Sequence, residues 1–132
     1  MRIFLDTNVL ASALTTRGLC AELFEVVLQS HDLLISEAVF RELQCILPEK
    51  LGQTEAITNG FIALLRTEGQ VITAEHPFPK IPDPDDEAIL AAALAGNANV
   101  FVTGDKALLN LESVEGLPII TPRGLWESLA NE

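Results

Sequence analysis

Residues 1–10 read Met1-Arg2-Ile3-Phe4-Leu5-Asp6-Thr7-Asn8-Val9-Leu10, so that three large apolar residues lead directly into an acid, a hydroxyl and an amide. A short continuous apolar run is typical of a core strand in a parallel sheet, where other elements cover both faces. Ligands of such sheets bind in the crevice beyond the carboxyl ends of the strands. The Asp6 carboxylate would lie at that edge, where its burial is unfavourable unless a partner such as a metal ion compensates.

A second strand of the same kind is predicted further along the chain, where Asn99-Val100-Phe101-Val102-Thr103-Gly104-Asp105 again ends in an acid. We expect strands at 2–6, 32–35, 70–73, 99–103 and 118–121, and helices at 7–14, 19–29, 36–47, 54–67, 85–95, 105–111 and 122–130. This alternation indicates an α/β fold, here a three-layer α/β/α domain with a central parallel sheet and a Rossmann-like crevice at its carboxyl edge. No repeat or linker interrupts it, so we expect one domain over residues 1–132.

The composition is that of a globular protein. Hydrophobic residues make up 48% of the 132 residues, enough for a sizeable core. The longest apolar run, residues 88–95, is too short to cross a membrane, and no basic segment precedes an apolar one as in a secretory signal. Cys20 and Cys45 lack the spacing of a zinc site or a disulfide framework, which predicts buried free thiols. We therefore expect a cytoplasmic protein without membrane contact.

The net charge of −11 bears on the partner class. Taken alone it argues against nucleic acid, because phosphate binding normally depends on Lys and Arg. That inference weakens if several carboxylates hold divalent cations, since each cation cancels negative charge locally. The charge therefore leaves the substrate class open, and it predicts that a metal-free form would bind a polyanion poorly.

Two further acids are predicted to face the crevice. On the helix at 36–47, Glu42 lies about 60° from the centre of the apolar stripe, at the flank of the buried face. That stripe consists of Val39, Leu43, Ile46 and Leu47. In the acidic cluster at 83–87, Asp86 shares a helical face with the apolar residues that follow, whereas Asp85 is rotated away from it. The cluster could supply its ligand from either residue, and the helical face favours Asp86.

Each of these acids also has an ordinary structural interpretation. Asp6, Asp105 and the acids at 83–87 could cap helix N-termini, and Glu42 could be an ordinary boundary residue. Yet Asp6, Glu42, Asp86 and Asp105 all map to one edge of one sheet, where four carboxylates would repel one another without cations. Oxygen ligands without clustered His or Cys favour Mg²⁺ or Mn²⁺.

Other reaction classes find less support. The sequence contains no Gly-x-Ser-x-Gly, no Walker loop and no Gly-x-Gly-x-x-Gly, so a serine hydrolase and a nucleotide cofactor are unsupported. A HAD-type phosphatase would need a second Asp two residues after Asp6, and Asn8 stands there. A receiver-like signalling module would need a phosphoacceptor Asp after a central strand, where the chain has Thr73 and Ala74. Metal-assisted hydrolysis is the class that the acids favour.

The sequence resembles the PIN domain family in the order and spacing of four segments. These are Leu5-Asp6-Thr7-Asn8-Val9-Leu10, Ser36-Glu37 through Arg41-Glu42-Leu43, Asp83-Pro84-Asp85-Asp86 and Val102-Thr103-Gly104-Asp105. The resemblance covers nearly the whole chain. It is greatest to the single-domain prokaryotic branch that contains the VapC-like toxins of toxin–antitoxin systems.

The resemblance implies an Mg²⁺- or Mn²⁺-dependent endoribonuclease that hydrolyses RNA phosphodiester bonds. It implies that Asp6, Glu42, Asp86 and Asp105 are the catalytic residues and the metal ligands. A PIN-like module that binds metal or nucleic acid without activity is the alternative, and the presence of all four acids argues against it.

Polar neighbours and partners follow from the same resemblance. Asn8 and Thr103 match supporting positions of the family, whose side chains would orient the ligands. Lys106 directly follows Asp105, either to contact a phosphate or as a solvated residue at a helix start. A toxin of this branch would also have a cognate antitoxin protein, and the resemblance suggests a homodimer.

Overall fold

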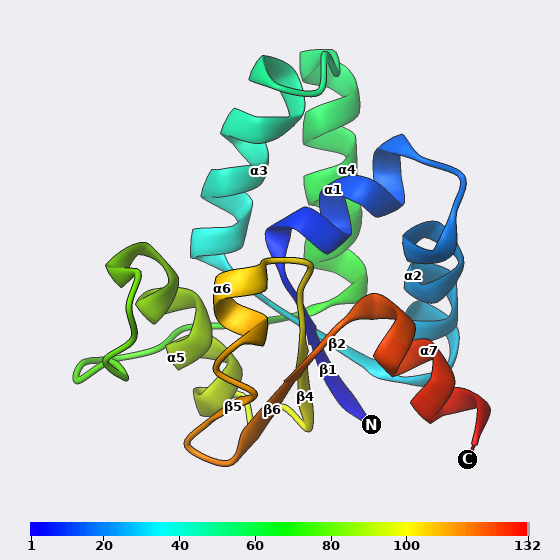
Figure 1. Cartoon of the computed structure of the whole chain (residues 1–132). Coiled ribbons are helices and arrows are strands. Elements are labelled where there is room, and N and C mark those ends of the chain that lie inside the picture. Colours follow the sequence, from blue (N-terminus) through cyan, green and yellow to red (C-terminus); the bar gives the residue numbers. More distant parts are fainter. Residues whose placement is uncertain (132) are drawn as a thin grey trace.

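A central six-stranded sheet organises the computed structural model, which describes residues 1–131 (Figure 1). Its strands are β1 (Arg2–Leu5), β2 (Asp32–Ser36), β3 (Gln70–Ile72), β4 (Val100–Val102), β5 (Ser113–Val114) and β6 (Leu117–Ile120). They lie in the order β3-β2-β1-β4-β6-β5, and every neighbouring pair is parallel except β5 and β6. The predicted α/β class with a mainly parallel sheet is confirmed.

Helices lie on both sides of this sheet, with α5 on one side and α2 and α7 on the other (Figure 1). Their bounds are α1 Thr7–Thr15, α2 Leu19–Ser30, α3 Glu37–Glu49, α4 Glu55–Glu68, α5 Glu87–Ala95, α6 Lys106–Leu109 and α7 Pro122–Ala130. A 3₁₀ turn, Pro84–Asp86, precedes α5. The paired helices α3 and α4 extend beyond the carboxyl edge of the sheet (Figure 1). None of these helices is long and apolar enough to span a membrane.

The core is densest between the central strands. Phe4 on β1 and Phe101 on β4 are register partners, and their rings stack with centroids 5.3 Å apart. Both side chains are fully buried, as are their neighbours Ile3, Leu5 and Val102. These strands are continuously apolar because helices cover both faces. Their carboxyl ends therefore emerge from a rigid core directly beneath α1, α3 and α6.

Polar residues at strand ends begin the helices that follow. Asp6 and Asp105 come after β1 and β4, and Ser36 is the last residue of β2. Each of these side chains accepts a hydrogen bond from a backbone N–H at the start of α1, α6 or α3. Such caps satisfy amides that have no partner inside the helix. The capping interpretation of Asp6 and Asp105 is therefore correct, and it coexists with their position at the sheet edge.

Two details of the sequence prediction are wrong. The helix expected at 105–111 ends at Leu109, and the chain then forms an unexpected β5–β6 hairpin. Its turn holds Glu115 and Gly116, both with positive φ (49° and 85°), a conformation that Asn or Asp usually signals at the first position. Cys45, expected to be buried, is exposed on α3, and Cys20 is partly buried.

Adjacent residues of α4 test how far stability depends on this packing. Leu65 is fully buried, whereas Leu64 is 41% exposed. We predict that Leu65→Ala lowers the free energy of unfolding by about 2–5 kcal/mol, because it removes buried methyl groups and leaves a cavity. Leu64→Ala is the matched control and should change it by less than about 1 kcal/mol. Urea denaturation measures both, and equal losses would contradict the assignment of the buried face.

Candidate active site

Asp6 is a buried carboxylate, only 5% exposed, at the point where β1 ends. One oxygen, Oδ1, accepts a hydrogen bond from the Thr7 backbone N–H at 2.8 Å. The other, Oδ2, accepts from Thr103 Oγ1 at 2.8 Å and from Asn8 Nδ2 at 3.2 Å. Desolvation raises the pKa of Asp6, and these hydrogen bonds act in the opposite direction. Three neutral donors thus hold the carboxylate in a fixed orientation, and no Lys or Arg of the described residues forms an ion pair with it.

Thr103 and Asn8 also tie the end of β4 to the start of α1. Thr103 Oγ1 accepts a hydrogen bond from Asn8 Nδ2 at 3.3 Å and one from the Asp105 backbone N–H at 3.1 Å. Asn8 Oδ1 in turn accepts from the Gly104 N–H at 3.0 Å. The two residues predicted to support Asp6 therefore contact it directly. They also set the position of the loop that carries Asp105.

Asp105 lies on the exposed side of this loop. One of its carboxylate oxygens caps α6 by accepting from the Ala107 N–H at 2.8 Å. Its charge is close enough to Asp6 to contribute to the raised pKa of Asp6. Lys106, the first residue of α6, is exposed beside it.

Glu42 reaches the same region from α3. It is partly buried, and its Oε1 accepts a hydrogen bond from Thr7 Oγ1 at 2.7 Å. Burial raises the pKa of Glu42, the Thr7 hydroxyl lowers it, and the charge of Asp6 raises it further. Thr7 thus links Asp6 to Glu42, a role that the sequence analysis missed. The available signal was its place between Asp6 and Asn8, at the first position of a helix.

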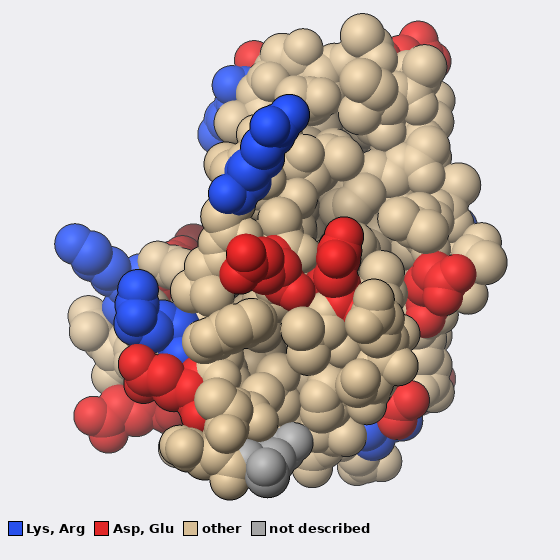
Figure 2. Space-filling view, turned by 90° about the vertical axis from the view of Figure 1, so that its right-hand side faces the viewer, with Lys and Arg blue, Asp and Glu red and all other residues tan. Residues whose placement is uncertain are grey.

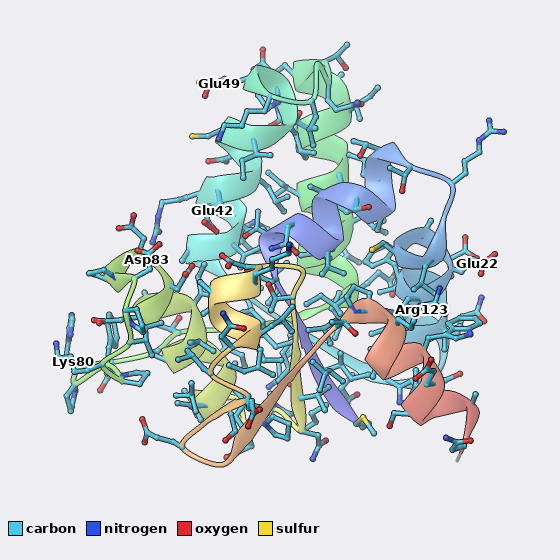
Figure 3. The ribbon with its side chains drawn as sticks, viewed as in Figure 1. Glu22, Glu42, Glu49, Lys80, Asp83 and Arg123 are labelled. Atoms are coloured by element: carbon cyan, nitrogen blue, oxygen red, sulfur yellow. The ribbon has the colours of Figure 1, made fainter. Side chains whose placement is uncertain are left out.

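Asp86 ends the 3₁₀ turn before α5 and is partly buried. Burial is the main cause that raises its pKa to about 6. Smaller contributions come from the charges of Asp6, Asp83, Asp105 and Glu42. The charges of the other three predicted acids therefore all act on Asp86. Asp83, from the segment before the turn, adds to them. Figure 3 shows Glu42 on α3 and Asp83 before α5 on neighbouring parts of this edge.

The other acids of the cluster make their hydrogen bonds elsewhere, although the charges of Asp83 and Asp85 contribute to the raised pKa of Glu42. Asp85 is exposed, and Asp83 accepts a hydrogen bond from its backbone N–H at 3.0 Å. Glu87 faces the proline-rich segment, where it accepts from the Ile81 N–H at 3.4 Å and lies 3.9 Å from Lys80 Nζ. Within the described chain, ion pairs join Glu87 to Lys80 and Glu37 to Arg66, so that none neutralises the four acids.

The donor chemistry of the cluster fits a hard divalent cation. Its atoms are carboxylate oxygens, and the pKa values of Asp6, Glu42 and Asp86 are all raised, chiefly by burial and further by the neighbouring acids. Among residues 1–131, however, no three acidic, histidine or cysteine side chains are placed to hold one ion together. Mg²⁺ or Mn²⁺ bound at this edge would offset the repulsion between the carboxylates.

Both the sequence and the fold are similar to those of known proteins. A family model described as PIN domain matches residues 2–107. Curated protein sequences give no match. Among solved structures, VapBC2 from Rickettsia felis, bound to a DNA fragment from its promoter, is similar with a TM-score of 0.68 and 17% identity, covering 92% of this chain and 98% of that chain.

Two further structures share the fold. VapBC-1 from nontypeable Haemophilus influenzae has a TM-score of 0.63 and 20% identity, with 93% of this chain and 99% of that chain covered. The PIN domain endonuclease Utp24 has a TM-score of 0.54 and 19% identity, with 91% and 84% covered. Because the sequence identities are 17–20%, these structures show that the fold is shared.

The raised pKa of Asp86 predicts a pH dependence of stability. A folded pKa of about 6 exceeds the usual unfolded value for Asp of about 3.9, so the folded protein binds this proton more tightly. The free energy of unfolding of the metal-free protein should therefore rise as the pH falls from about 7 towards about 4. Asp86→Asn removes this contribution, so it should stabilise the protein at neutral pH and flatten the pH profile.

Asp85→Asn is the matched control, because Asp85 is the exposed neighbour of the same charge. Urea unfolding in EDTA across this pH range compares both variants with the wild type. If Asp85→Asn flattened the pH profile of the free energy of unfolding more than Asp86→Asn does, the placement of Asp86 within the cluster would be contradicted.

Proposed function

This chain belongs to the PIN domain family, and from that premise we propose that it is a metal-dependent endoribonuclease. In this proposal Asp6, Glu42, Asp86 and Asp105 hold Mg²⁺ or Mn²⁺ and form the catalytic centre. The observation that supports it most strongly is the Asp6 carboxylate, which is buried and oriented by three neutral donors but forms no ion pair with Lys or Arg within residues 1–131. A purely structural acid in that position would be expected to pair with Lys or Arg.

The chain's own residues would prepare the reaction. Thr103, Asn8 and the Thr7 N–H hold Asp6 rigidly, so that little reorganisation accompanies substrate binding. A bound divalent cation would supply an activated water and stabilise charge on the scissile phosphate. A carboxylate oxygen not engaged with the ion would accept the proton of the attacking water.

The contacts of Asn8 argue against the alternative of a HAD-type phosphatase. Its amide nitrogen donates to Asp6 and its amide oxygen accepts from the Gly104 N–H. A HAD-type phosphatase would use a second carboxylate at this position. The Asn8 amide instead connects Asp6 to the loop before α6 through these two hydrogen bonds.

We extend the proposal to partners of the toxin–antitoxin type. The support is the likeness to the two VapBC structures, which covers nearly all of both chains. A cognate antitoxin that binds this protein would meet a net charge of −11. Asp and Glu side chains are spread across the middle of the face formed by α2 and α7 (Figure 2). A basic partner would complement this surface, and a homodimer belongs to the same proposal.

The function is tested by cleavage of single-stranded RNA in Mn²⁺. Asp6→Asn exchanges the charge for an amide of the same shape, so it should reduce the rate at least about a hundredfold while the fold persists. Asp32→Asn is the control, because Asp32 is exposed at the opposite end of the sheet. Gel assays of RNA cleavage measure both variants.

Other outcomes would replace the proposal. An unchanged cleavage rate in Asp6→Asn would eliminate this site. Release of phosphate from a phosphomonoester without RNA cleavage would favour a phosphatase. Binding of Mn²⁺ without cleavage of any RNA would favour a binding module.

A further inference from the structure

Two hollows on the surface between α3 and α5 join at Arg41. The first has a volume of about 220 Å³, and its lining includes Ser36, Thr73 and Phe78. The second has a volume of about 440 Å³, and its lining includes Glu42, Asp85 and Ile89. Both share Ala38, Arg41 and Ala88, so one groove runs from the end of β3 past Arg41 to the acids. We name this feature the α3–α5 groove.

Arg41 is the cation in the lining of the α3–α5 groove, and its charge also contributes to the lowered pKa of Glu37. It is exposed, and the structure gives it no hydrogen bond or ion pair within residues 1–131. The acid one turn earlier on α3, Glu37, is instead bound by both terminal nitrogens of Arg66, at 2.7 and 3.0 Å. The Arg66 guanidinium is further fixed 4.2 Å above the Phe40 ring. Because Arg66 neutralises Glu37, the charge of Arg41 remains available to a ligand.

The far end of the α3–α5 groove carries an aromatic surface. Phe78, partly buried, lines the first hollow, and its ring stacks on His76 with centroids 3.9 Å apart. An aromatic ring at the edge of a groove that contains a cation such as Arg41 is suited to stack on an unpaired base. The N-terminus of α3 opens onto the same hollow and adds a partial positive charge beside Arg41.

We propose that a single-stranded RNA lies in the α3–α5 groove, with a phosphate held by Arg41 and a base stacked at Phe78. This inference rests on the proposed ribonuclease function and names the path of its substrate. Guanidinium groups bind phosphate oxygens through paired hydrogen bonds. A single strand fits because stacking on a side chain requires a base that is free of a partner strand. With a net charge of −11, the protein needs such a local cation to bring a polyanion to its acids.

Fluorescence anisotropy of a short labelled single-stranded RNA in Mg²⁺ tests the groove, with every variant built on Asp6→Asn so that the RNA stays intact. Arg41→Gln should weaken binding about tenfold. It should also reduce the slope of log Kd against log salt by about 0.7, the value for one phosphate contact on a single strand. Arg41→Lys should restore most of the slope. Lys50→Gln, which removes a charge at the other end of α3, should change neither quantity.

Variants of Phe78 distinguish the contribution of base stacking to RNA binding from that of charge in the same assay. Phe78→Leu keeps an apolar side chain but removes the ring, so binding should weaken about tenfold with the salt slope unchanged. Phe78→Trp should preserve affinity. In the wild-type background, Arg41→Gln should raise KM for cleavage with little change in kcat, because the phosphate contact acts on binding.

The outcomes for the groove and for the function are distinguishable. If the wild type cleaves RNA but Arg41→Gln matches Lys50→Gln in affinity and salt slope, the groove is not the path, and the ribonuclease function stands. Unchanged affinity in Phe78→Leu would remove the stacking site. If the wild type neither binds nor cleaves RNA, both inferences are overturned.

Discussion

The site depends on one constraint, the burial of the Asp6 carboxylate at the junction of β1 and β4. Parallel pairing of these strands places Asp6 and Thr103 side by side, and the Thr103 hydroxyl donates to Asp6 at 2.8 Å. Thr7, whose backbone N–H also donates to Asp6, donates a hydrogen bond from its hydroxyl to Glu42 on α3. The stacked, fully buried Phe4 and Phe101 hold both strands beneath this junction. A rigid apolar core thus supports a cluster of charges that would otherwise move apart.

The charge cluster opposes folding and is retained because the rest of the fold offsets it. Burial and like charges raise the pKa values of Asp6, Glu42 and Asp86, and the hydrogen bonds of Asp6 reduce this effect only in part. Sites of this kind are expected where function rather than stability determines the residues. In the described residues no three acids converge on one point, although the charges of all four act on Asp86 or on one another at one edge.

The fold was largely predictable because its central strands are buried on both faces and read as uninterrupted apolar runs. The acids at strand ends were found for the same reason, since each follows such a run. Their catalytic role stays a prediction. The β5–β6 hairpin was missed because Glu115 adopts a positive φ that its residue type does not signal. Thr7 was missed because a hydroxyl in a first helical turn carries no periodic pattern.

The α3–α5 groove could not have been predicted from the sequence. Arg41 lies outside the apolar stripe of its helix, and it is exposed. Its significance arises from elements distant in the chain, because Arg66 on α4 neutralises Glu37, and α5 forms the opposite wall. Periodicity describes which face of a helix is buried, but it does not tell which other segment comes to lie beside the exposed face.

Thermal unfolding with and without Mg²⁺, at matched ionic strength, tests the central claim most directly. A cation that binds only the folded acids must raise the melting temperature of the wild type. Asp105→Asn preserves the cap of α6, because Asn is also a good N-cap residue, but it removes one carboxylate from the cluster. The account predicts a clear Mg²⁺ shift for the wild type and a much smaller one for Asp105→Asn. Equal shifts, or none in either protein, would show that these carboxylates are helix caps and polar boundary residues rather than a metal site.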